Sequence, residues 1–176
     1  MPTAKRSEPA PASDELLAKI YREQFEFVWR SLRGLGFGES EAEDLAQDVF
    51  LVARRRLPDF DRSRPLRPWL FGILRRVASD RRRSAARTER RLRLLPPPSP
   101  GENPEQRTVQ AEAASFVEQF LATLDESRRM IFILSEAEGM SGTEIAEALG
   151  INRNTVYTRL RAARQQFAAA ILERGP

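Results

Sequence analysis

A proline-rich tract near the middle of the chain constrains the fold more than any other feature of the sequence. Residues 92–109 begin LRLLPPPSPGENPEQRT and hold five of the 12 prolines. Proline lacks the backbone N–H that a helix needs and clashes with the preceding turn, so this tract cannot lie inside a helix. We therefore expect two folded domains, at 14–91 and 110–176, joined by a flexible linker at 92–109. Residues 1–13 are expected to be a disordered tail.

Both domains are predicted to be all-α and small. Their apolar residues recur at steps of three and four, and neither domain has the alternating pattern of a strand. In the first domain this spacing predicts helices over about 14–34, 41–56 and 68–86. Ser40, with a glutamate three residues later, predicts a capping box for the second helix, and Pro68 is the expected first residue of the third.

The end of the second domain has the pattern of a helix-turn-helix. Ser141 and Glu144 predict a capping box before a short helix, Gly150 allows a left-handed turn, and Asn152 caps a last helix over about 153–170. In such a motif the start of the last helix enters the DNA major groove. The outward residues suited to bonding bases or phosphates are Arg153, Asn154, Tyr157, Thr158, Arg161 and Arg164. The alternative is a helical hairpin whose arginines only confer solubility.

The third helix of the first domain combines an apolar stripe with dense positive charge. Residues 75–93 carry nine arginines and only two acidic residues, whereas the whole chain has a net charge of +4. Such a concentration favours a polyanionic partner, although a solvated charged helix has the same composition. Leu70, Ile73 and Leu74 belong to the predicted buried stripe, and Phe71 is predicted on the opposite flank. Trp69 can either pack at the edge of the core or stack on a base.

The composition excludes several classes of function. The chain has no cysteine and no histidine, which excludes disulfides and leaves a catalytic or metal site with carboxylates alone. The only regular carboxylate pair is Asp44 and Asp48, and two acids on one helix face are usually solvated or dock a protein. The sequence has no membrane-spanning run and no signal-peptide pattern at its start. We expect a cytoplasmic protein without enzymatic activity, cofactor or membrane insertion.

Three stretches together resemble the sigma-70 family of bacterial RNA polymerase sigma factors, in its extracytoplasmic-function (ECF) group. AEDLAQDVFLVARRRLPDFD resembles region 2.1–2.2, and LRPWLFGILRRVASDRRR resembles region 2.3–2.4. LDESRRMIFILSEAEGMSGTEIAEALGINRNTVYTRLRAAR resembles region 4. The resemblance implies an alternative sigma factor that binds core RNA polymerase, recognises −35 and −10 promoter elements, melts promoter DNA and initiates transcription of a specific regulon. It implies an anti-sigma factor as a further partner, and no homo-oligomer is expected.

The resemblance also assigns roles to the faces found above. The clamp of the polymerase β′ subunit would dock on Asp44, Gln47, Asp48 and Leu51, and the β flap would contact region 4. The −10 element would be bound and melted by Asp61, Arg62, Arg64, Arg67, Trp69, Arg75, Arg76, Ser79, Asp80 and Arg83. The six outward residues of the last helix would read the −35 element. Primary sigma factors have two adjacent tryptophans at the melting position, where this chain has Trp69 and Leu70.

A stand-alone helix-turn-helix regulator is the alternative function. It would bind duplex DNA without polymerase, typically as a dimer on a palindrome. The acidic, glutamine-bearing face at 44–51 distinguishes the two hypotheses, because a stand-alone regulator has no use for it.

Overall fold

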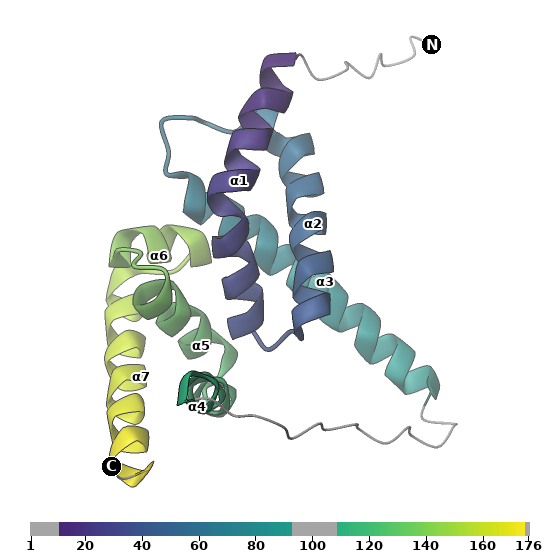
Figure 1. The fold of residues 1–176 in the computed structure, drawn as a ribbon. Helices are drawn as coiled ribbons and strands as arrows, with labels where there is room; N and C mark the ends of the chain where they lie inside the picture. Colours follow the sequence, from purple (N-terminus) through teal and green to yellow (C-terminus); the bar gives the residue numbers. More distant parts are fainter. Residues whose placement is uncertain (1–10, 93–108, 175–176) are drawn as a thin grey trace.

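The computed structural model describes residues 11–92 and 109–174, and all the secondary structure in these ranges is helical (Figure 1). The first half holds α1 (Pro11–Gly34), α2 (Glu39–Arg56), a short 3-10 turn η1 (Leu57–Asp59) and α3 (Leu66–Leu92). The second half holds α4 (Val109–Thr123), α5 (Glu126–Phe132), a π-helical turn η2 (Ile133–Ala137), α6 (Gly142–Leu149) and α7 (Arg153–Arg174). The all-α prediction is therefore confirmed. Residues 1–10 and 93–108, which include most of the predicted tail and linker, lie outside the described residues.

The first half is a three-helix arrangement. α1 and α2 lie side by side, and α3 crosses behind them (Figure 1). The face of α2 that packs inward is the predicted one, because its apolar residues recur at helical spacing. Its buried residues are Ala42, Leu45, Ala46, Val49, Phe50 and Ala53.

Three helix starts differ from the prediction. α1 begins at Pro11 rather than at about 14, so residues 11–13 of the predicted tail are helical. α2 begins at Glu39, and its N-cap is Gly38, whose carbonyl accepts a 2.8 Å hydrogen bond from the Ala42 N–H. The predicted capping box at Ser40 is wrong, because Ser40 already lies inside the first turn. α3 begins at Leu66, so Pro68 is its third residue rather than its first. Proline is tolerated there because the first N–H groups of a helix have no intrahelical acceptor.

The buried face of α3 is wider than the single predicted stripe. Leu70 and Leu74 are fully buried, as predicted, and Ile73 is nearly so. Phe71, which was predicted on the opposite flank, is only 1% exposed, so that prediction is wrong. The reason is that α3 contacts α6 as well as α1 and α2, and a helix with neighbours on several sides buries more than one stripe.

The two halves of the chain pack directly against each other. One continuous core cluster joins Phe71 and Leu74 of the first half to Ile131, Leu134 and Ile145 of the second. The contact at the end of α1 is close: a Cβ at Gly34 would lie 2.6 Å from Cδ1 of Ile133. A smaller second cluster around Phe120, Phe132 and Phe167 joins α4, α5 and α7. The packing therefore places the second half against the surface of α3.

Candidate nucleic-acid interface

The helix-turn-helix is formed by α6 and α7, as predicted. The Ser141 hydroxyl accepts a 3.3 Å hydrogen bond from the Glu144 N–H, and the Ser141 N–H donates a 2.9 Å bond to the Glu144 carboxylate. Gly150 has φ = +66°, the left-handed conformation that glycine adopts without steric cost. The Asn152 side chain then accepts a 2.8 Å bond from the Asn154 N–H at the start of α7. Each of these local signals was readable in the sequence.

We expect Ser141→Ala to lower the free energy of unfolding by about 1 kcal/mol, because the N-cap of α6 loses its acceptor. Ser40→Ala is the matched control and should cost much less, since Ser40 is not a cap.

The stability contributed by this capping box should also depend on pH. Bonds from Ser141 hold the pKa of Glu144 below its ordinary value. A lowered carboxyl pKa contributes stability above the unfolded pKa that is lost as pH falls through the folded pKa. Urea unfolding at neutral pH and near pH 3 should therefore show a smaller Ser141→Ala effect in acid.

The outward face of α7 carries the predicted DNA-reading residues. All six are exposed in the structure. The Tyr157 ring approaches Gly142 of α6, where a Cβ would lie 3.0 Å from the ring, and the Arg153 guanidinium lies 5.4 Å from the Tyr157 ring centroid. Arg164 differs from the others because its Nη2 forms a 2.7 Å ion pair with Glu136. The N-terminal part of α7 is thus the part that presents side chains outward, as in a recognition helix.

A second basic surface surrounds a cleft of about 930 Å³ between α3, the loop before it and the second half. The cleft brings together seven of the ten residues predicted to bind the −10 element: Asp61, Arg64, Trp69, Arg75, Arg76, Ser79 and Arg83. Arg62 and Asp80 are exposed but are not among the residues that line it. Five arginines line this cleft, since Arg56 joins the four predicted ones, and four acidic residues line it with them. The arginines can bind the phosphates of a nucleic-acid backbone.

Asp61 organises the loop that leads into α3. Its Oδ1 accepts hydrogen bonds from the Ser63 N–H at 3.0 Å and from the Ser63 hydroxyl at 2.7 Å. The Arg64 N–H donates to the Asp61 carbonyl at 3.0 Å, which closes the turn. These bonds from Ser63 hold the pKa of Asp61 below its ordinary value. Asp61 therefore shapes the loop, and the arginines that follow it supply the positive charge.

Trp69 lies in the wall of the cleft. Its ring is half-buried, and its centroid lies 4.5 Å from that of Phe60 in the loop. The pair contributes to packing, while part of the tryptophan also lines the open cleft. Both sequence interpretations of Trp69, packing and base stacking, are therefore compatible with its position. Leu70 beside it is fully buried and belongs to the core.

Arg67 differs from the other predicted −10 residues because it points into the protein. Its Nε donates to Gln24 of α1 at 3.2 Å, and its Nη1 donates to the Glu138 carbonyl at 3.0 Å. Its guanidinium also lies 5.1 Å from the Phe27 ring centroid. In this structure Arg67 joins α3 to α1 and to the second half rather than facing the cleft.

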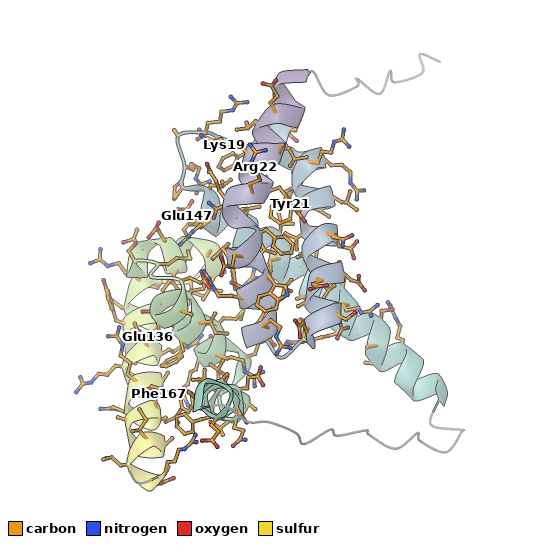
Figure 2. All side chains as sticks on the ribbon, viewed as in Figure 1. Lys19, Tyr21, Arg22, Glu136, Glu147 and Phe167 are labelled. Carbon is orange, nitrogen blue, oxygen red and sulfur yellow. The ribbon has the colours of Figure 1, made fainter. Side chains whose placement is uncertain are left out.

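The third predicted site lies on α2. Asp44, Gln47, Asp48 and Leu51 are all exposed, and 54% of Leu51 is accessible to solvent. Gln47 and Leu51 also line a groove of about 680 Å³ between α1 and α2. Tyr21 and Arg22 of α1, which are labelled in Figure 2, line the same groove. Sequence reasoning missed Tyr21 of α1, which lines this groove and packs its ring 4.8 Å from Phe50. The sequence signal that could have identified Tyr21 is an aromatic residue that lies outside the row of apolar residues on the buried face of its helix.

Arg81 of α3 borders the acidic face of α2. Its Nε forms a 2.8 Å ion pair with Glu41. This bond, together with the charges of Glu41, Asp44 and Asp48, raises the pKa of Arg81. Arg81 therefore interacts electrostatically with the acidic residues on this face of α2.

Among the described residues, no group of acidic side chains could hold a metal ion, and no helix is long and apolar enough to cross a membrane.

The comparisons with known proteins agree with this arrangement. The model of sigma-70 region 2 matches residues 20–88, and that of sigma-70 region 4 matches residues 117–167. The RNA polymerase sigma factor NccH of Alcaligenes xylosoxydans xylosoxydans is 31% identical over 92% of this chain and 96% of its own length. The ECF RNA polymerase sigma factor SigL of Mycobacterium tuberculosis is also 31% identical, over 98% of each chain.

Solved structures with the same fold include two sigma factors bound to other proteins. CnrH in complex with the cytosolic domain of CnrY has a TM-score of 0.70 and 26% identity, with 93% of this chain and 91% of that chain covered. RpoE of Bartonella quintana with the anti-sigma factor NepR has a TM-score of 0.72 and 23% identity, with 89% and 97% covered. The chain belongs to the sigma-70 family of RNA polymerase sigma factors. Within that family it is a member of the ECF group, with regions 2 and 4 in its two halves, and it has the function of an alternative sigma factor.

Proposed function

We propose that this sigma factor recognises a promoter through two separate surfaces and delivers core RNA polymerase to it. The observation that carries the proposal is that one chain holds both a recognition helix and a basic, tryptophan-lined cleft. A helix-turn-helix reads duplex DNA in the major groove. A cleft with arginines and an aromatic ring suits a single strand, whose backbone binds the charges while its bases stack. The two surfaces therefore suit the −35 element as duplex and the −10 element as an opened strand.

We call the cleft beside α3, which contains Trp69 and Arg64, the −10 cleft. It would stabilise opened promoter DNA by binding it, without a catalytic step. Unstacking a base pair step costs a few kcal/mol, and stacking of a released base on an aromatic side chain returns about 1–3 kcal/mol. Trp69 supplies the aromatic surface, while Arg64, Arg75 and Arg76 hold the phosphates. The chain thus stabilises the open strand by binding it, and the polymerase carries out the synthesis of RNA.

The exposed face of α2 is the proposed contact with the clamp of the polymerase β′ subunit. Asp44 and Asp48 offer charge, Gln47 offers an amide, and Leu51 offers an apolar surface beside the groove that contains Tyr21. An exposed leucine next to carboxylates and an aromatic ring is typical of a protein-docking surface. We place the β flap against region 4. Because both polymerase and promoter are cytoplasmic in bacteria, this proposal places the chain in the cytoplasm.

An anti-sigma factor is a further proposed partner. CnrH and RpoE, which share this fold, were each solved with another protein bound, namely CnrY and the anti-sigma factor NepR. We extend this type of regulation to the present chain.

Transcription with purified components tests the proposed function. The chain should bind core RNA polymerase, and the resulting holoenzyme should produce run-off transcripts from promoters selected out of a random DNA library. Core polymerase alone should produce none from the same templates. Salt-sensitive binding of a symmetric dimer to palindromic duplex DNA, with no complex formed with core polymerase, would instead establish the stand-alone regulator.

A further inference from the structure

The ring of Tyr157 in α7 packs directly on the first residue of α6, which is Gly142. A Cβ at Gly142 would lie 3.0 Å from Cζ, 3.1 Å from Oη and 3.2 Å from Cε1 of the Tyr157 side chain. These separations are shorter than the optimal distance between carbon atoms, so the ring takes the space that a side chain at position 142 would need. The glycine therefore lets the ring lie against the backbone of α6, while 48% of Tyr157 stays accessible to solvent.

The backbone that carries Tyr157 is fixed by its neighbours. Val156 is fully buried, and Leu160, one turn further along α7, is only 7% exposed. At the start of α7, the Asn152 side chain accepts its 2.8 Å hydrogen bond from the Asn154 N–H. Because the buried residues set the rotation of α7 against the core, the Tyr157 ring has a defined place on the outward face.

Arg153 is the neighbour of Tyr157 on that face, because residues four apart in a helix lie one above the other. Its guanidinium carbon lies 5.4 Å from the ring centroid, within the range of a cation–π contact. An aromatic face supports a guanidinium without using its N–H donors. Within the described residues, no ion pair or side-chain hydrogen bond engages Arg153. The donors of Arg153 are therefore free to bind a ligand while the ring restricts its orientation.

Arg164 of the same helix is held in the opposite way. Its Nε and Nη2 donate hydrogen bonds to Oε1 of Glu136 at 3.0 Å and 2.7 Å. A carboxylate thus takes up donors with which an arginine would otherwise bind a base or a phosphate. Of these two predicted DNA-reading arginines, Arg153 is the one whose donors are prepared for DNA.

We propose that Tyr157, packed on Gly142, is a positioning residue that holds the Arg153 guanidinium ready to bind a guanine, and that Tyr157 acts on DNA recognition through Arg153. The proposal rests on the proposed function, since it takes α7 as the helix that reads the −35 element. An arginine binds O6 and N7 of guanine together in the major groove. A ring that already restricts the guanidinium reduces the conformational entropy lost when this contact forms.

A base-analogue experiment tests the role of Arg153. Holoenzyme is titrated with duplex promoters selected from the random library, in which 7-deazaguanine, which lacks the N7 acceptor, replaces each guanine of the −35 element in turn. For the parent we expect one guanine whose replacement weakens binding by about tenfold, and Arg153→Ala should abolish this penalty. A penalty that Arg153→Ala retains, or selected promoters that share no guanine in the −35 element, would overturn the inference alone. If no base change in the −35 element alters the affinity of the parent, the −35 assignment in the proposed function fails as well.

Substitutions at Tyr157 separate positioning from direct contact with DNA. Tyr157→Phe keeps the ring and should keep the 7-deazaguanine penalty of the parent. Tyr157→Leu keeps an apolar side chain but removes the aromatic face, so the penalty should fall by about threefold. If Tyr157→Leu instead weakens binding to the guanine and 7-deazaguanine promoters equally, Tyr157 contacts DNA itself or only packs, and the positioning role is refuted.

Gly142→Ala tests the same contact from α6. Alanine favours a helix more than glycine does, and the exposed Tyr157 ring has room to move away from the new Cβ. We therefore expect a urea midpoint no lower than that of the parent, together with a smaller 7-deazaguanine penalty. In the Tyr157→Leu background, Gly142→Ala should change the penalty no further, because both substitutions act through one contact. An effect that persists in that background, or that is absent in the parent background, would overturn the role of the Gly142 contact.

Discussion

Asp48→Lys is expected to weaken binding to core RNA polymerase by about 100-fold, with little effect on the fold. Asp48 is exposed on α2, at the centre of the face proposed to dock on the clamp. Reversing a charge in a docking surface removes one attraction and adds a like-charge contact, which together cost about 3 kcal/mol. Within the protein the change removes only part of the charge near Arg81, whose hydrogen-bonded partner is Glu41. The measurement is a titration of core polymerase with labelled sigma factor.

Glu43→Lys provides the control for this prediction. It makes the same charge change on the same helix, at an exposed position that lies outside the proposed docking face. The two variants should unfold at similar denaturant concentrations, and only Asp48→Lys should lose polymerase. Equal affinities for the two variants would move the clamp contact away from this face of α2.

The features that were predicted correctly depend on residues close together in the sequence. The capping box at Ser141, the left-handed turn at Gly150 and the buried stripe of α2 each arise within one or two helical turns. Local hydrogen bonds and helical periodicity specify such features, so one sequence is enough to find them. The predicted cap at Ser40 was wrong because the helix begins two residues earlier, with Gly38 at the N-cap, and glycine ranks only a little below serine at that position.

The features that were missed depend on contacts between residues far apart in the sequence. Phe71 is buried because α3 has a neighbour in α6, and Arg67 points inward because Glu138 lies opposite it. Glu138 itself has no distinguishing local pattern, since a glutamate near a helix end is usually solvated. Helical periodicity describes one face of one helix, and it contains no information about which distant segment covers the other faces. The packing of the two halves was therefore beyond the reach of the sequence.

Trp69 offers the second test with a large expected effect, on promoter opening. In Trp69→Ala the holoenzyme should still bind duplex promoter through α7, but stable opening should fall by about 10- to 100-fold. The reason is that stacking on an aromatic ring is worth about 1–3 kcal/mol per base. Opening can be followed by permanganate reactivity of thymines around the −10 element, and duplex binding by a mobility shift.

Trp69→Leu distinguishes stacking from packing. Leucine keeps an apolar side chain against Phe60, whose ring lies 4.5 Å from that of Trp69, but it offers no flat aromatic surface to a base. If Trp69 acts by stacking, both substitutions impair opening, while Trp69→Leu retains most of the stability that Trp69→Ala loses. If Trp69 only packs, Trp69→Leu opens promoters as the parent does, and the stacking role in the cleft is refuted. Urea unfolding of both variants supplies the stability comparison.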